Sequence, residues 1–227
     1  MPQRNKRMKN KSLSRSQKKA VREIVDKVID LNIEDKRKVY LNENLQLYHN
    51  KPVYIGKFLS DLAQGVNTGT DAQSSSKTRI GDRIKLKNFN LRFWLSNKLD
   101  RPNVMYKAVL FWYPVDLGAQ ITDQDVYFTQ QNKMLDRYND KRIKIIDTFI
   151  VKSTNNYAVD ANNHEHSYIA TLNKSWKNKF VQFETNSTKC KGWELGFSLV
   201  AYDAFGTLQT DNIASYALNT QLTFEDA

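Results

Sequence analysis

Residues 83–95 read RIKLKNFNLRFWL, and the spacing of their apolar side chains decides the fold class. Apolar and polar residues alternate from Ile84 and again from Phe89 onward, which is the period of a half-buried β-strand. The alternation slips by one residue near Asn88. Such a slip predicts a β-bulge, so the segment is expected to form one long, bulged strand with a single face toward a core.

Six further runs are rich in aromatic and β-branched residues, as strands are. They begin at Val104, Lys141, His166, Lys179, Gly192 and Ser215. Only ITDQDVYFTQQNKML, from Ile121, has a helical pattern among them, and no internal repeat is present. At least seven strands without alternating helices predict an all-β sandwich or barrel, which we assign to residues 82–227.

The amino-terminal residues 1–22 concentrate positive charge. They hold nine Lys or Arg and no Asp or Glu, so of 35 basic residues 35 − 9 = 26 remain against 24 acidic ones. Such an arm is expected to bind polyanions by releasing their counterions, although a solubilising tail or a nuclear-import signal has the same composition. The proposed nucleic-acid-binding residues are Arg4, Lys6, Arg7, Lys9, Lys11, Arg15, Lys18, Lys19 and Arg22.

An amphipathic helix is predicted over residues 14–40, overlapping the arm, because apolar residues recur there at steps of three and four. Ser14 or Ser16 is expected to cap its start, and the cations at 36–38 suit its carboxyl end. We expect its apolar stripe to pack against helices of other subunits, the alternative being its own domain. The stripe residues chosen for this contact are Val21, Ile24, Val25 and Val28.

Residues 41–81 have no clear period and read as an irregular linker, rich in Gly, Ser, Thr and Asn after Gln64. A signal peptide is not expected, and the longest apolar run, AVLFWYPV at 108–115, is too short to span a bilayer. Cys190 is the only cysteine, which excludes an intrachain disulfide and favours a reducing compartment. These features predict a soluble protein.

No catalytic residues are predicted. His164 and His166 flank Glu165 as a possible metal pair, but the carboxylate and third histidine that a cupin site needs do not follow in the expected positions. Neither a nucleophile elbow nor a phosphate-binding glycine loop occurs. The chain is therefore expected not to be an enzyme.

The order of these segments resembles the coat protein of satellite tobacco necrosis virus and the capsid proteins of circular Rep-encoding single-stranded DNA (CRESS-DNA) viruses. The resemblance rests on EDKRKVYLN from Glu34, RIGDRIKL from Arg79, LFWYP from Leu110, YNDKRIKIIDTF from Tyr138 and the terminal FEDA. The loops at 153–165 and 185–191 have no counterpart.

This resemblance implies an eight-stranded viral jelly roll that assembles as 60 copies into a T=1 icosahedral shell, a virion with the arms facing a single-stranded genome. The chain's extra length favours DNA over RNA, with the host nucleus as the compartment for a DNA genome and the cytoplasm for an RNA genome. No membrane partner is implied. The alternatives are a non-viral nucleic-acid-binding protein or chaperone with a β-sandwich body, and a lectin-like or cupin-like ligand-binding jelly roll.

The same resemblance implies Ca²⁺ between subunits, where a hard cation offsets repulsion between carboxylates. The matching ligands are the carboxylates of Glu34 and Asp226 and backbone oxygens near Ile80 and Arg83. The positive charge of Arg83 opposes such a site. Two solvated surface acids are the alternative.

Overall fold

The computed structural model describes residues 13–32, 35–65, 78–98, 100–101, 103–117, 120–129, 131–152, 167–203 and 207–227. The chain divides into two compact units, Met1–Glu34 and Asp35–Ala227. None of the described helices has the length and apolar character needed to cross a membrane.

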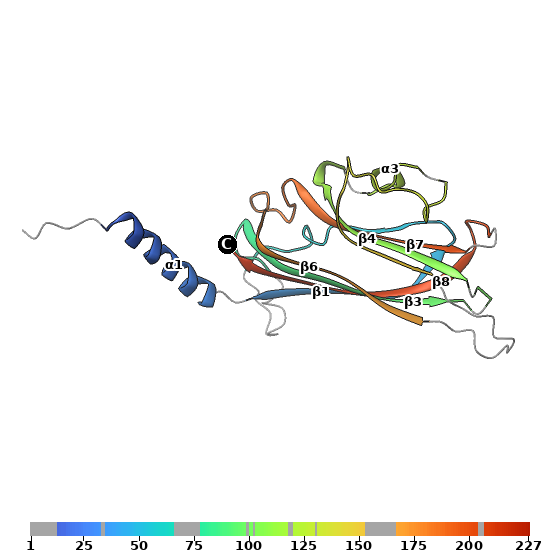
Figure 1. Cartoon of the computed structure of the whole chain (residues 1–227), viewed down its shortest axis with the longest axis horizontal. Coiled ribbons are helices and arrows are strands. Elements are labelled where there is room, and N and C mark those ends of the chain that lie inside the picture. The colour runs from blue at the N-terminus through green and yellow to red at the C-terminus, as the bar shows by residue number, and fades with distance from the viewer. Residues whose placement is uncertain are drawn as a thin grey trace, which may run out of the picture. The chain divides into compact units, whose positions relative to one another are not determined.

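The first unit contains helix α1, Arg15–Asn32 (Figure 1). Ser14 caps its start as predicted. The Gln17 amide donates to the Ser14 hydroxyl at 3.3 Å, and the Ser14 amide donates back to the Gln17 side chain at 2.9 Å. This reciprocal pair satisfies two amides that would otherwise lack partners at a helix start.

The expected extension of this helix to residue 40 is wrong. The helix ends at Asn32, and strand β1, Lys36–Tyr48, follows. Lys36 pairs with Phe224 and Val39 with Gln221, so a distant strand satisfies the backbone of this segment. Tertiary pairing thus outweighs the helical preference of a basic run, which is a weak local signal.

Two four-stranded antiparallel sheets form the second unit (Figure 1). The first sheet has the order β1-β8-β3-β6, and the second has the order β2-β7-β4-β5. The remaining strands are β2 Val53–Ile55, β3 Arg83–Asn97, β4 Val104–Pro114, β5 Lys144–Lys152, β6 Ser167–Gln182, β7 Trp193–Asp203 and β8 Asn212–Asp226. Eight strands in this order form a jelly roll, which confirms the predicted fold class.

The strand predictions hold for most of this unit. The bulge in β3 is confirmed, because its register shifts between Leu86 and Asn88 against both β6 and β8. The runs predicted from His166 and Lys179 belong to one strand, β6. In the described part of the segment predicted as helical from Ile121, the short helix α3, Asp123–Val126, is the one helix present. A short 3₁₀ helix, Val115–Leu117, follows β4.

The predicted boundary between linker and body is also displaced. The second unit begins at Asp35 rather than residue 82, and β1 and β2 both lie within or before the segment expected to be irregular. β1 supplies an edge of the first sheet and β2 an edge of the second, so this segment is part of the sandwich.

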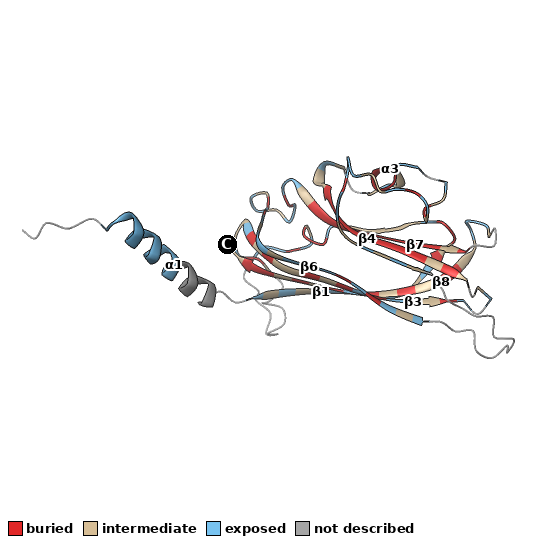
Figure 2. Ribbon diagram, in the orientation of Figure 1, coloured by how far each residue is buried: buried red, intermediate tan, exposed pale blue. Residues whose placement is uncertain are grey.

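The core lies between the two sheets, and Figure 2 shows buried residues along their facing sides. Alternate residues of β3 point inward, with Leu91 and Phe93 buried among them. Phe93 meets Phe197 of β7 at 5.7 Å and Phe149 of β5 at 5.4 Å between ring centroids. Because both sheets contribute to one apolar cluster, neither is expected to be stable alone.

The outer face of the second sheet is covered by the segment that follows β4. Val126, Tyr127 and Ile143 form a buried cluster with Val109 and Phe111 of β4. This covering segment carries α3, which lies over β4 and β7 in Figure 1. Large apolar side chains are exposed on the outer face of the first sheet, such as Trp94 and Ile169, and on β5 at the edge of the second sheet, such as Ile150.

A buried lysine fixes the covering segment. The ammonium of Lys107, on β4, donates to the carbonyl oxygens of Lys133 at 2.9 Å and Asp136 at 2.6 Å. Burial lowers the pKa of Lys107. Carbonyl acceptors compensate the cost of removing this group from water.

Candidate nucleic-acid interface

Four of the five basic residues of α1 gather on one side of the helix, and Lys27 lies outside this arc by helical periodicity. Arg15, Lys18, Lys19 and Arg22 are spaced so that they occupy roughly a third of the helical circumference. All four are exposed. Lys19 lies 4.0 Å from Glu23, and such an exposed pair contributes little. This side of α1 can therefore present several cations to one polyanion.

The apolar residues of α1 form a stripe that runs beside the basic side. Val21, Ile24 and Val25 are 46%, 61% and 47% exposed, respectively. Val28 belongs to the same helix, but its side chain is outside the described part of the structure. Ile24 is roughly opposite the basic side by helical periodicity, whereas Val25 follows Lys18 by seven residues and therefore borders that side. A polyanion and an apolar partner would thus use adjacent surfaces of α1.

Arg4, Lys6, Arg7, Lys9 and Lys11 are outside the described residues. Arg15, Lys18, Lys19 and Arg22, which lie within α1, are thus the part of the proposed interface with a defined arrangement.

The predicted calcium ligands are partly brought together. The Ile80 amide donates to the Asp226 carboxylate at 2.9 Å, so these two distant residues are neighbours. Arg83 instead stacks on the ring of Phe180, 4.0 Å from its centroid, and its backbone carbonyl accepts from the Ala227 amide at 3.2 Å. Glu34 is outside the described residues.

A lysine already neutralises Asp226. Its carboxylate contacts the ammonium of Lys36, which also donates to the Thr78 carbonyl at 2.9 Å. Among the described residues, no group of three or more His, Cys, Asp or Glu side chains is arranged to hold a metal ion. A cation at this position would therefore have to compete with Lys36 for Asp226.

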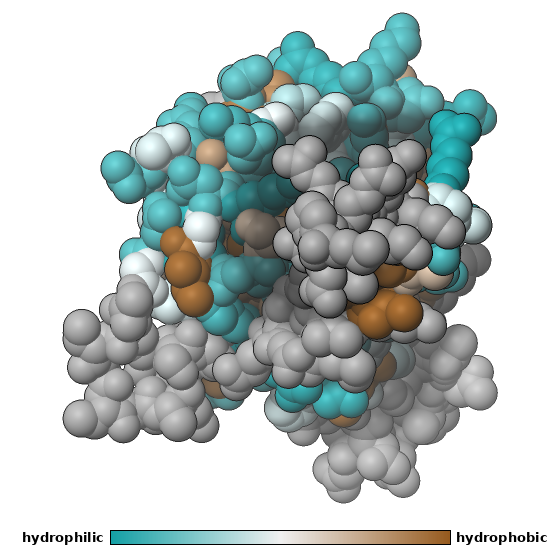
Figure 3. Space-filling model, turned by 90° about the vertical axis from the view of Figure 1, so that its left-hand side faces the viewer, coloured by the Kyte–Doolittle hydropathy of each residue, from teal (hydrophilic) through white to brown (hydrophobic). Residues whose placement is uncertain are grey.

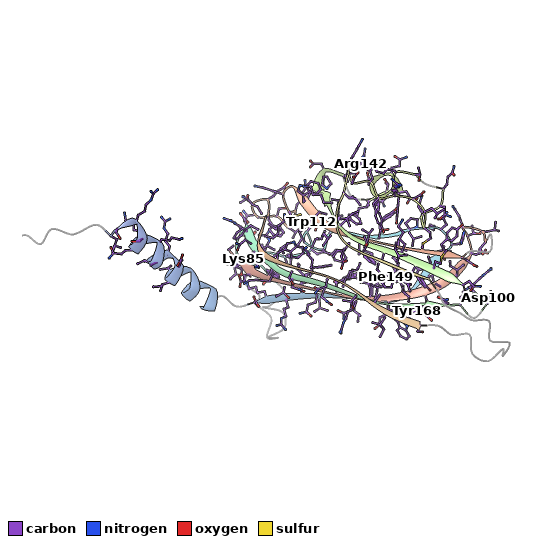
Figure 4. All side chains as sticks on the ribbon, viewed as in Figure 1. Lys85, Asp100, Trp112, Arg142, Phe149 and Tyr168 are labelled. Atoms are coloured by element: carbon purple, nitrogen blue, oxygen red, sulfur yellow. The ribbon has the colours of Figure 1, made fainter. Side chains whose placement is uncertain are left out.

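The first sheet carries basic residues that the sequence analysis did not assign to a site. Lys85 of β3 lies 3.4 Å from the buried Glu225 carboxylate of β8, and Lys87 contacts the other oxygen of that group. Figure 4 shows Lys85 at the end of the sheet near the carboxyl terminus. The sequence could have indicated these basic residues on the outer face of the sheet, because Lys85 and Arg92 occupy polar positions of the alternating β3 pattern.

The described surface is largely hydrophilic in the view of Figure 3, with apolar groups scattered over it.

His49 is buried, and its Nδ1 accepts a hydrogen bond from the Asp203 amide at 3.1 Å. Burial lowers the pKa of His49, which favours its neutral form. His164 and His166 are outside the described residues. His49 therefore has a structural contact, and the described chain offers no histidine for a metal pair.

No protein-family model matches the sequence, and no curated protein matches it. A structure of Desmodium yellow mottle tymovirus is similar, with 13% identity and a TM-score of 0.34 over 86% of this chain and 88% of that chain. A chain of the T13 IBDV viral particle is 10% identical, with a TM-score of 0.26, and the match covers 85% of this chain but 36% of that one.

A third similar structure is VP1 of Trichodysplasia spinulosa-associated polyomavirus in complex with GM1 oligosaccharide. It is 10% identical, with a TM-score of 0.13 over 85% of this chain and 78% of that chain.

Proposed function

We propose that this chain is a viral capsid protein that forms a T=1 shell of 60 copies and packages a single-stranded genome through its amino-terminal arm. The observation that carries the proposal is the separation of charge from core. The nine cations precede Glu23, whereas the buried apolar core begins at Leu47 within the other compact unit. One unit can bind a polyanion while the other builds the shell.

Charge matching sets the scale of the cargo. Sixty copies would supply 60 × 9 = 540 arm charges, given nine per chain. At one phosphate per nucleotide, these charges would balance between about half and all of the charge of a genome of roughly 500 to 1,000 nucleotides. Single-stranded DNA is our first choice for the cargo, because the chain is longer than the satellite coat proteins it resembles. RNA is the second, since phosphate contacts alone do not require a 2′-hydroxyl.

A free nucleic-acid-binding protein or chaperone is the second candidate function, because the basic side of α1 would serve it equally well. The two differ in assembly. We expect electron microscopy of the purified full chain to show hollow particles about 200 Å across, as 60 domains of this size would form.

Sequencing of nuclease-protected nucleic acid from the same particles would identify the cargo. Monomers or small oligomers that bind nucleic acid, without closed particles under any assembly condition, would instead support the chaperone. A lectin-like or cupin-like protein would neither bind nucleic acid nor form closed particles.

We further propose that Ca²⁺ binds between subunits at Glu34, Asp226 and the backbone near Ile80 and Arg83. A chelator should then lower the melting temperature of the particles, because carboxylates brought together by assembly would repel each other once the cation leaves. Glu34→Gln with Asp226→Asn should abolish this response. The measurement is particle melting with Ca²⁺ and with chelator.

Lys36→Gln provides the matched control. It removes the ammonium that contacts Asp226, so particles of this variant should depend more strongly on Ca²⁺ than the wild type. If the chelator has no effect on the wild type, or an equal effect on the double variant, the proposed metal site is wrong.

A further inference from the structure

The outer face of the first sheet has a hollow beside Trp94. It measures about 170 Å³ and is lined by Asn44, Trp94, Ser96, Ser215, Tyr216 and Ala217. Trp94 points away from the core and is 54% exposed, although tryptophan is usually among the better buried side chains. An exposed indole beside a hollow offers an aromatic wall to a ligand.

A bulge in β1 supplies the opposite wall. The register between β1 and β8 shifts between Asn42 and Leu45, and Asn44 within this bulge has a φ of 57°. This left-handed conformation is uncommon outside glycine, and asparagine is one of the few residues that adopts it readily. Bulges often redirect a side chain near a functional site, and here the bulge places Asn44 at the hollow.

The lining is suited to hydrogen bonding with a ligand. The Ser96 hydroxyl accepts a long bond from the Ser167 hydroxyl at 3.4 Å, which leaves its own O–H free to donate. Ser215 adds a second hydroxyl and Asn44 an amide with both donors and acceptors. The hollow thus combines an aromatic wall with polar groups that can recognise the edge of a planar heterocycle.

A basic side chain lies next to this hollow. Arg92 precedes Trp94 by two residues on the same face of β3, about 6.7 Å away along the strand. It is exposed, and within the described part of the chain it has no carboxylate partner. Its register neighbours are Thr171 of β6 and Asn219 of β8, both uncharged. Arg92 is therefore available to an anion that approaches the sheet.

Two acidic residues belong to this sheet face or its edge. Glu225 is already neutralised by Lys85 and Lys87. Glu43 is exposed and precedes Asn44 on the bulge, so its charge would oppose an anionic ligand. The net charge near Trp94 thus depends on Arg92 and Glu43. Replacing Arg92 by a neutral residue would make it more negative, and replacing Glu43 would make it more positive.

We propose that this hollow binds one unpaired base of single-stranded nucleic acid. The base would stack on Trp94 and bond with Asn44, Ser96 or Ser215, while the adjoining phosphate meets Arg92. A volume of about 170 Å³ exceeds the roughly 150 Å³ of a cavity known to hold benzene, so one heterocyclic ring fits. The choice of this ligand rests on the proposed function, because the nucleic acid that the arm packages would also be the molecule that binds this hollow.

The register neighbour of Trp94 on β6 is the exposed Ile169, so this face also offers apolar surface to a second copy of the chain. The polar lining of the hollow and the unpaired charge of Arg92 favour a nucleotide over that second copy. Obligate protein interfaces bury a largely apolar centre depleted of charge, whereas Trp94 adjoins Arg92 and the amide of Asn44. Stacking of bases on exposed aromatic rings, combined with nearby cations, is the usual way to bind single strands without sequence preference.

The test uses the full chain in about 0.5 M salt, where counterion release contributes least to binding by the arm. A short oligothymidylate is compared with an abasic oligonucleotide of the same length. We expect Trp94→Ala to weaken binding of oligothymidylate roughly 5- to 150-fold, the usual cost of losing one stacked base, and to leave abasic binding unchanged. Trp94→Phe should retain part of the affinity. Glu43→Gln should tighten binding of both oligonucleotides.

Tryptophan fluorescence gives a second measurement. Oligothymidylate should quench the emission of the wild type, and the abasic strand should not. Because the chain has four tryptophans, the quenching belongs to Trp94 only if Trp94→Ala loses it. Equal affinity of the wild type for both oligonucleotides, or no effect of Trp94→Ala on either, would overturn the proposed base site. So would a loss of particle assembly in Trp94→Ala with unchanged affinity for oligothymidylate, which would assign the face to a second copy.

The result can be separated from the proposed function. If oligothymidylate binds in low salt through the arm but Trp94 has no influence at any salt concentration, the base site is wrong and the packaging arm stands. If the full chain binds no oligonucleotide in low salt, the packaging function itself is wrong.

Discussion

Deletion of residues 1–22 is expected to remove most of the packaged nucleic acid while leaving a folded body. The deletion eliminates all nine arm cations, whereas the buried apolar core begins at Leu47. If all nine contact phosphates of a single strand, the slope of log K against log salt concentration should change by about 6. The measurements are oligonucleotide affinity across salt concentrations and the nucleic-acid content of purified particles.

A second variant separates charge from chain length. Replacing the nine Lys and Arg residues by Gln keeps the length of the arm and the stripe of α1, so its packaging should fail as the deletion does. Shuffling residues 1–12 with their charges retained should preserve packaging. Undiminished nucleic-acid content in the deletion or the Gln variant would contradict the assigned role of the arm.

Ile24→Asp with Val28→Asp is expected to prevent assembly without unfolding the isolated subunit. Full burial of an Ile or Val side chain stabilises by about 1.5–3 kcal/mol, so the pair represents about 3–6 kcal/mol per subunit if it is buried between copies. Ile24 is 61% exposed, and exposed substitutions usually change subunit stability by about 0.5 kcal/mol or less. Particle yield and subunit melting temperature are the two measurements.

The matched control is Ile24→Leu with Val28→Leu, which keeps the stripe apolar and should assemble. A fall in subunit melting temperature that accompanies or precedes the loss of assembly would support the other interpretation of the stripe, in which α1 packs on its own domain. If α1 packs between subunits, assembly is lost while the subunit stays folded. If α1 packs on its own domain, the subunit loses stability first.

The sequence was most informative where a strand has one buried face. In β3 the alternation and its slip near Asn88 predicted both the strand and its bulge, because the inward residues must be apolar. The same logic failed for β1, where a bulge at Asn44 interrupts the alternation and basic residues begin the strand. β2 is only three residues long, too short to show a period.

The strand β6 was predicted as two runs for a related reason. It is an edge strand, and its middle carries Asn173, Lys174 and Ser175, which face solvent and interrupt the apolar pattern. Backbone pairing with β3 holds this polar stretch in the sheet. Local composition cannot show such pairing, because the partner lies far away in the sequence.

The candidate sites also differ in whether local sequence or tertiary pairing forms them. The basic arm was readable because charge density is a local property. The hollow beside Trp94 was not, since its walls come from β1, β3 and β8, brought together only by the sheet. The position of Lys36 against Asp226 was equally hidden, because these residues are 190 positions apart.

The place of β8 between β1 and β3 also sets the timing of folding. A ribosome finishes β3 at Asn97 and reaches Asn212 after 212 − 97 = 115 further residues. At roughly 5–20 residues per second, this interval lasts about 6 to 23 seconds. Throughout it, two strands that have already been synthesised lack the neighbour that joins them. The growing chain therefore carries unpaired sheet edges for many seconds, and during this interval these edges can pair with other chains and aggregate.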